Sequence, residues 1–276
     1  GRLARAGGAL GVVLIALLGG FARGRGGGGH YPAAPTLTVM NLNLLASNRD
    51  VDAVLAAIAA EDPDVLLLQE YTERWHAAIY PYLEMRFPEY AQFARPDAYG
   101  QAVYSKHRFT GPAVRSPLAD VHPTPQMIVR SDHAGREVAI RNIHLLSPAT
   151  PSLMLEGYHE AQRLAEQCAA SDVPLIAMGD FNATPNSAHA SLLRRAGMID
   201  THAAAGVGRG ATWPRLGVFR FAPGVRIDQA FASGELAVVA SRLGAETGSD
   251  HLPIIAEFAW AEPRAEGPRP RDRRGE

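Results

Sequence analysis

The sequence has 276 residues, of which 47% are hydrophobic and 20% charged, a composition typical of a globular chain long enough for one large domain or two small ones. A formal net charge of −1 excludes a global basic field that would attract nucleic acid. Cys168 is the single cysteine, so an intrachain disulfide is excluded and the redox compartment stays open.

The N-terminal part contains an uncharged apolar stretch at residues 9–21. It is short for a full span, which needs about 20 residues. We expect residues 1–23 to be a membrane anchor or signal-like segment, with the anchor favoured and secretion as the alternative. Arginines flank the stretch on both sides, so the positive-inside rule assigns no orientation. Residues 24–35 are rich in Gly and end in Pro, which predicts a linker.

Strand and helix patterns then alternate, as is typical of an α/β fold. Residues 36–45 begin with alternating β-branched residues and predict a strand. Residues 50–61 have an acidic start and apolar side chains at helical spacing, and the apolar run 65–68 has the length of a buried strand. We expect a helix over 72–85 that is broken around Pro81, and short strands at 90–94 and 102–105.

The second half of the chain continues this pattern after a proline-rich loop at 111–125. Residues 126–130 and 137–143 predict a hairpin that turns at 132–135. Residues 152–169 predict a long amphipathic helix. The other expected elements are strands at 174–178, 226–231, 236–243 and 254–258, a helix at 188–196, an irregular segment at 201–220 and a disordered tail at 261–276.

The motif GDFNATP occupies residues 179–185, directly after a predicted buried strand. Asp180 and Asn182 are two residues apart, so a locally extended chain directs both side chains the same way. A carboxylate beside a carboxamide suits a water nucleophile, because one group removes the proton and the other orients the water. Gly, Asp, Asn and Pro also form turns, and on this window alone a turn is the favoured interpretation.

Polar residues at comparable positions elsewhere reverse that preference. They follow predicted strands or lie in the loop before the last strand: Asn41, Glu70, His144, Asp180 with Asn182, Asp228, Asp250 and His251. In α/β sheets the strand ends and the loops after them build the active site. Each residue also has a structural interpretation: Glu70 as a helix cap, for example, and Asp228 as a partner of Arg226.

The oxygen donors in this set indicate a magnesium site. Glu70 and Asp250 are hard carboxylate ligands and Asn41 can add a neutral oxygen, which suits Mg²⁺, with Mn²⁺ as the alternative ion. Structural zinc would require Cys and His at fixed spacing. A metal ion here would neutralise a phosphate oxygen and the charge that develops on it. His251 beside Asp228 has the pattern of a histidine oriented by a carboxylate.

The ordered motifs VMNLNLL, LLLQE, NIHLLSP, GDFNATP, VRIDQAF and GSDHLP resemble the endonuclease/exonuclease/phosphatase superfamily, of the DNase I-like type, over residues 36–260. The resemblance implies a four-layer α/β sandwich of two packed mixed β-sheets with helices outside. It also implies a metal-dependent phosphoric ester hydrolase. The apolar N-terminal segment joined to such a domain resembles a bacterial membrane-associated branch, which places the chain at the bacterial cell membrane.

The resemblance also implies roles for individual residues. Asn41, Glu70 and Asp250 would form the metal site, and Asp180 with Asn182 would activate or orient the water. Asp228 would support His251. His144 matches a histidine that exonuclease III-like members usually lack, which argues against abasic-site repair.

We therefore expect a monomeric Mg²⁺-dependent phosphoesterase that cleaves a phosphodiester or phosphomonoester, with lipid- or envelope-linked phosphates fitting the anchor best. A membrane-associated nuclease is the alternative. Near-neutral charge disfavours it, since binding a phosphate backbone needs many cationic contacts, although Arg215, Arg220 and Arg226 are candidates for a local cluster. A binding module without turnover is the third hypothesis. Trp213 and Phe219, in the irregular segment, are candidates to line the substrate groove.

Overall fold

The computed structural model describes residues 36–118, 125–221 and 223–261. The expected anchor at 1–23, the linker at 24–35 and nearly all of the tail at 261–276 lie outside these residues. Within the described ranges, none of the helices combines the length and the hydropathy that a bilayer crossing requires.

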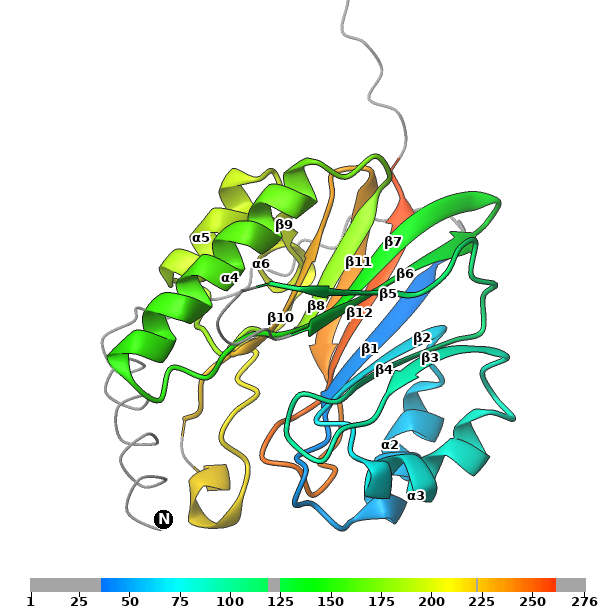
Figure 1. Cartoon of the computed structure of the whole chain (residues 1–276), viewed down its shortest axis with the longest axis vertical. Coiled ribbons are helices and arrows are strands. Elements are labelled where there is room, and N and C mark those ends of the chain that lie inside the picture. Colours follow the sequence, from blue (N-terminus) through cyan, green and yellow to red (C-terminus); the bar gives the residue numbers. More distant parts are fainter. Residues whose placement is uncertain (1–35, 119–124, 222, 262–276) are drawn as a thin grey trace, which may run out of the picture.

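Two six-stranded mixed sheets form the body of the protein (Figure 1). The first sheet has the order β11 (Leu236–Leu243), β12 (Ile254–Trp260), β1 (Leu37–Asn43), β2 (Val65–Gln69), β4 (Gln101–Ser105) and β3 (Glu89–Phe93). The second has the order β5 (Val114–Pro117), β6 (Pro125–His133), β7 (Arg136–His144), β8 (Leu175–Asp180), β10 (Asp228–Ala232) and β9 (Ile199–Asp200). Each sheet has one parallel pair at its centre, β1 with β2 and β7 with β8.

Helices cover the outer faces of the two sheets, so the predicted four-layer α/β sandwich is confirmed (Figure 1). The first sheet is covered by α2 (Val51–Glu61) and α3 (Glu73–Leu83), and the second by α4 (Pro151–Ala169) and α5 (Ala188–Arg195). A short helix, α6 (Thr201–Ala205), and a 3₁₀ helix, η1 (Gly217–Phe221), lie within the segment expected to be irregular.

The period-two alternation of the central strands sorts their side chains into layers. In β1, Leu37 and Val39 belong to the cluster between the sheets, whereas Met40 and Leu42 belong to the cluster under α2 and α3. All four side chains are fully buried, and burial of each contributes about 1.5–3 kcal/mol relative to exposure. The inner layer therefore consists of alternate residues from both sheets.

The same alternation brings polar side chains to one end of the inner layer. In β8, Ile176 and Met178 join the inner cluster, and Asp180 continues their face at the end of the strand. β7 ends on the same face at His144, and β10 begins with Asp228. Strand geometry thus explains why residues far apart in the sequence meet at one edge of the sandwich.

Three predicted elements differ from the structure. Helix α3 continues through Pro81, which lies near its end and so costs it little hydrogen bonding, while Trp75 and Ile79 are fully buried and hold it on the sheet. Strand β5 lies inside the expected loop 111–125. Helix α6 forms because the Asp200 side chain caps it, accepting hydrogen bonds from the first backbone N–H groups of the helix.

Candidate active site

A pocket of about 260 Å³ lies at this polar edge. Of the predicted site residues, those that line it are Glu70, His144, Asp180, Asn182, Asp250 and His251. Asp228 lies behind His251 and contacts it. The pocket lining contains three carboxylates and two imidazoles but no lysine or arginine.

Strand register places Asp180 at the centre of the site. In the second sheet Asp180 lies opposite His144 on the parallel side and opposite Asp228 on the antiparallel side. Gly179 makes the first pairing possible, because a Cβ at that position would lie 1.9 Å from the Ile143 carbonyl oxygen. The glycine of the GDFNATP motif therefore serves strand packing, and the aspartate after it is held rigidly.

The Asp180 carboxylate is buried and has few hydrogen-bond donors. Its Oδ1 accepts from the Asn182 backbone N–H at 2.8 Å and its Oδ2 from Asn43 Nδ2 at 3.2 Å. Burial raises the pKa of Asp180 and the nearby Asp228 adds to this, while the two histidines oppose it, so that the pKa is about 6. Such a carboxyl group is mostly ionised at neutral pH and accepts a proton more readily than an exposed aspartate.

Asn182 is fixed beside this carboxylate. Its backbone has a φ of 48°, in the left-handed region that asparagine tolerates better than most residues. Its side-chain Nδ2 donates to the Leu145 carbonyl oxygen at 2.8 Å. The amide is therefore held in one orientation at the pocket wall.

Two histidines flank Asp180, each with Nε2 at 3.8 Å from its Oδ2. His251 Nδ1 contacts Asp228 Oδ2 at 2.8 Å. Burial alone would lower the pKa of His251, but the charges of Asp228 and Asp180 outweigh it and raise the pKa to about 10. For His144 burial dominates and lowers the pKa. At neutral pH the site thus holds one imidazolium and one neutral imidazole.

Glu70 and Asp250 lie beside this cluster: Asn43 Nδ2 contacts both Glu70 and Asp180, and Asp250 Oδ1 lies 3.9 Å from His251 Nε2. Glu70 Oε2 accepts from the Ala46 backbone N–H at 2.7 Å, and Oε1 accepts from Asn43 Nδ2 at 3.3 Å. Burial raises the pKa of Glu70, and the negative charge of Asp250 also raises it. Asp250 Oδ2 accepts from Trp213 Nε1 at 3.1 Å, whereas its buried Oδ1 has no hydrogen-bond partner among the described residues.

This donor set fits a divalent cation. Glu70 and Asp250 repel each other, and Asp250 Oδ1 lacks a hydrogen-bond donor. Among the described lining residues there is no lysine or arginine, so the three carboxylates of the lining share one cation, the His251 imidazolium, whose Nε2 lies 3.9 Å from Asp250 Oδ1. Asp180, Asp228 and His251 also present ligand atoms within 4.8 Å of one another. The raised pKa of His251 keeps its ring protonated, so the oxygens of Glu70 and Asp250 are the better candidate ligands for a divalent cation.

Asn41 does not lie in this pocket. Its side chain is fully buried between the sheets, where Oδ1 accepts from Gln69 Nε2 at 2.6 Å. Asn43, two residues further along β1, contacts both Glu70 and Asp180 instead. Both asparagines share one face of the strand, but only the second reaches its end. Asn41, expected as a metal ligand, therefore lies outside the pocket. Asn43 reaches the pocket edge instead, where it donates a hydrogen bond to Glu70.

Several other contacts were outside the sequence-based prediction. The Tyr99 ring lies 5.8 Å from the His144 ring, and Ser249 Oγ donates to the Asn43 carbonyl at 2.7 Å while accepting from the His251 N–H. Of the two aromatic candidates named from the sequence, Trp213 lines the pocket, and its contact with Asp250 is the part that was not predicted. Phe219 is 57% exposed and is not part of this lining.

The structural interpretations weighed for single residues do not apply. Thr72, not Glu70, caps helix α3. Arg226 is buried and bonds Asp200 in a bidentate ion pair at 2.7 and 2.8 Å, so it neither pairs with Asp228 nor contributes to an exposed basic cluster.

Comparison with known proteins agrees with this geometry. The family model described as "Endonuclease/Exonuclease/phosphatase family" matches residues 25–251. A solved endonuclease/exonuclease/phosphatase from Beutenbergia cavernae is similar with a TM-score of 0.64 and 21% identity, covering 82% of this chain and 72% of that one. A family protein from Leptotrichia buccalis has a TM-score of 0.66 and 17% identity, with coverages of 81% and 100%.

Truncated Caenorhabditis elegans TDP2 has a TM-score of 0.63 and 20% identity, covering 81% of this chain and 98% of that one. At these identities the structures show a shared fold. A sequence search of curated proteins gave no match.

Proposed function

The chain belongs to the endonuclease/exonuclease/phosphatase family, whose members are metal-dependent phosphoric ester hydrolases, and we propose that it uses Mg²⁺ to hydrolyse a phosphodiester or phosphomonoester with water activated by Asp180. The observation that carries the proposal is the position of Asp180. Strand register holds it between His144 and Asp228, and the His251 imidazolium lies 3.8 Å away, within a pocket that also presents Glu70 and Asp250.

In the proposed reaction Asp180 accepts a proton from water as the water oxygen forms a bond to phosphorus and the ester P–O bond breaks. Asn182 helps to orient that water. The His251 imidazolium, held by Asp228, stabilises the negative charge on the phosphoryl oxygens. His144 is a second hydrogen-bonding group for the phosphoryl or leaving oxygen.

We assign the metal to Glu70 and Asp250, with Asn43 and Trp213 orienting these two carboxylates. Mg²⁺ prefers one or two carboxylates and retains several waters, so two ligands from the chain suffice. When bound, the ion would neutralise a phosphoryl oxygen and lower the barrier to attack.

The substrate we propose carries an isolated phosphate ester, not a long polyanion. The part of the pocket lining that the structure describes contains no lysine or arginine, and Arg226 is paired with Asp200. Binding a nucleic-acid backbone depends on many cationic contacts. We also propose association with the bacterial cell membrane through residues 9–21, which the sequence supports by their apolar composition.

The test is an activity screen of the full chain with Mg²⁺, with EDTA as the control. It compares an aryl phosphate, a lipid phosphodiester, inositol phosphates and plasmid DNA. We expect EDTA-sensitive hydrolysis of at least one small or lipid ester and little cleavage of plasmid DNA. Folded protein that hydrolyses none of these esters would refute the proposal, whereas preferred cleavage of the plasmid would support the nuclease alternative.

A further inference from the structure

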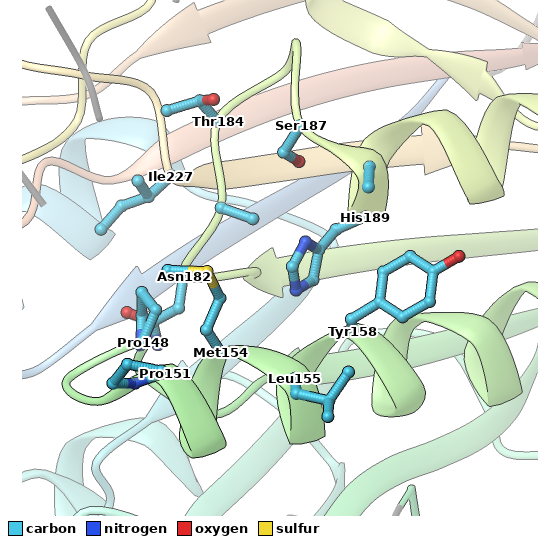
Figure 2. Close-up of a pocket in the computed structure, with 12 residues that line it drawn as sticks. Pro148, Pro151, Met154, Leu155, Tyr158, Asn182, Thr184, Ser187, His189 and Ile227 are labelled. Carbon is cyan, nitrogen blue, oxygen red and sulfur yellow. The ribbon is translucent and has the colours of Figure 1, made fainter. Parts of the chain in front are cut away.

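A second pocket, of about 400 Å³, adjoins the catalytic one. It lies between the N-terminal half of α4, the loop after Asp180 and the start of α5 (Figure 2). Pro148, Asn182 and Ile227 line both pockets, so the two pockets adjoin at these three residues. Its volume lies within the range of about 300–1,000 Å³ typical of small-molecule sites.

The chemistry of this second pocket is apolar. None of its twelve lining residues is Asp, Glu, Lys or Arg. Two of its polar groups are engaged in the fold: Ser187 Oγ accepts from the Ala190 N–H at 3.3 Å, and Asn182 Nδ2 donates to the Leu145 carbonyl oxygen. Burial lowers the pKa of His189, which keeps this ring neutral. The pocket therefore has no charge with which to bind an anion.

Exposed apolar side chains form one wall of the pocket. Met154 and Leu155 of α4 are 40% and 57% exposed, and Figure 2 shows them on the pocket side of this helix, with His189 of α5 facing them. Further along α4, Ala161 and Leu164 are buried against the sheet. Exposed apolar side chains that line a groove are one of the features that mark ligand-binding sites.

We propose that this pocket binds the apolar part of the substrate, which makes the substrate class phosphate esters of aliphatic chains. The inference rests on the proposed function, because it places the phosphorus at Asp180. From there an ester chain passes Asn182 and Ile227 into the pocket, where it covers Met154 and Leu155. Because the two pockets share three lining residues, one molecule can occupy both, which favours the substrate as the occupant over a partner protein.

The test uses 4-nitrophenyl alkyl phosphodiesters from methyl to octyl, with Mg²⁺ and the full chain. We expect kcat/KM to rise by about fourfold for each methylene until the pocket is filled. Met154→Gln, and more strongly Met154→Gln with Leu155→Gln, should reduce the octyl-to-methyl ratio by about tenfold or more, because each change removes apolar contact. Both side chains are exposed, so the variants should fold.

Met85→Gln is the matched control, since Met85 is 78% exposed and lies just after α3, on the other side of the sandwich. It should keep the wild-type ratio. A flat chain-length profile in the wild type would overturn the proposal, as would an unchanged ratio in the double variant. Loss of self-association in the double variant by sedimentation, at an unchanged ratio, would assign the pocket to a second copy of the chain and also overturn it.

Binding of alkylphosphonates, measured by calorimetry, separates this inference from the proposed function. These compounds need no turnover, and affinity that rises with chain length together with a negative heat-capacity change would support the pocket even if no ester were hydrolysed. Conversely, EDTA-sensitive hydrolysis without chain-length dependence in either assay would retain the proposed function and overturn the pocket assignment.

Discussion

Two buried ionic clusters lie within a few residues of each other and are built in opposite ways. Arg226 and Asp200 satisfy one another with two short bonds, and Asp200 also caps α6. Two residues further on, Asp228 belongs to the cluster of Asp180 and His251, where both histidines lie 3.8 Å from Asp180. The first cluster stabilises the fold. The second leaves charge that a substrate or metal can use, as is typical of functional sites.

The largest effect should follow from breaking the second cluster at its centre. Asp180→Asn removes the proton acceptor while keeping the size of the side chain. We expect kcat to fall by about 10²–10⁴-fold, the usual contribution of a positioned general base. Steady-state kinetics on the best substrate of the screen measures this. Asp172→Asn, an exposed aspartate paired with Arg130, is the control and should retain activity. Near-normal turnover by the Asp180→Asn variant would show that Asp180 is not the general base.

Breaking the first cluster, by contrast, should lower the stability of the fold. Asp200→Asn keeps an oxygen that can cap α6 but leaves the Arg226 charge buried without its partner. We expect the free energy of unfolding to fall by about 3–5 kcal/mol. Denaturant unfolding measures this, and the double change Asp200→Asn with Arg226→Met should recover much of the loss. A single variant as stable as the wild type would contradict the contrast between the clusters.

The sequence predicts much of this arrangement because strands have a period of two. The alternation in residues 36–45 and the apolar run at 65–68 predict the central strands, and polar residues after such runs indicate a shared edge. The choice between Asn41 and Asn43 could not be made from the sequence, because both lie on one face and only the end of β1 distinguishes them. Strand register decides it.

Other features depend on contacts between distant segments. Strand β5 lies in a stretch with repeated prolines, which predicts a loop, but it pairs with β6 in the folded chain. Tyr99 has no polar pattern around it that marks a site, and its role follows from its contact with His144. Trp213 is a candidate from the sequence, but its hydrogen bond to Asp250 follows only from the fold. Met154 and Leu155 belong to a helix whose periodicity predicts packing, so a pocket beside it was not expected.

An effect of intermediate size is expected on Mg²⁺ affinity, which substitution of Asn43 should weaken and substitution of Asn41 should not. Asn43→Ala removes the hydrogen bond that orients Glu70, and loss of such an outer contact typically weakens metal affinity by about 10–100-fold. Asn41→Ala should leave Mg²⁺ affinity unchanged and lower stability by about 1–3 kcal/mol, because it leaves the buried Gln69 amide with one acceptor fewer. Calorimetric Mg²⁺ titration of both variants distinguishes them, and equal weakening would contradict the assignment of Asn43.

The smallest effect, about tenfold, should come from pH and requires no mutation. As the pH falls from 7 to 5, Asp180 with its pKa of about 6 takes up a proton, so kcat/KM should fall about tenfold. The raised pKa also means that the native state binds more protons than the unfolded chain between about 3.8 and 6. This group therefore makes the protein more stable, not less, as the pH falls through that window.

The contribution of the Asp200–Arg226 ion pair to stability should not change between pH 7 and 5. Burial alone would raise the pKa of Asp200, but the bonds from Arg226 lower it below 3.8, so its contribution to stability is fully present above that value and lost only in stronger acid. His251, with its pKa raised to about 10, contributes stability that is complete below 6.5 and is lost as the pH rises through 10.

Burial lowers the pKa of His144, His189 and His202, so these rings cost stability as the pH falls below 6.5 and oppose the gain from Asp180. Activity should thus fall about tenfold between pH 7 and 5, while the folded fraction in the absence of denaturant stays constant. A parallel fall in both would mean that the acid limb reports unfolding and not the protonation of Asp180.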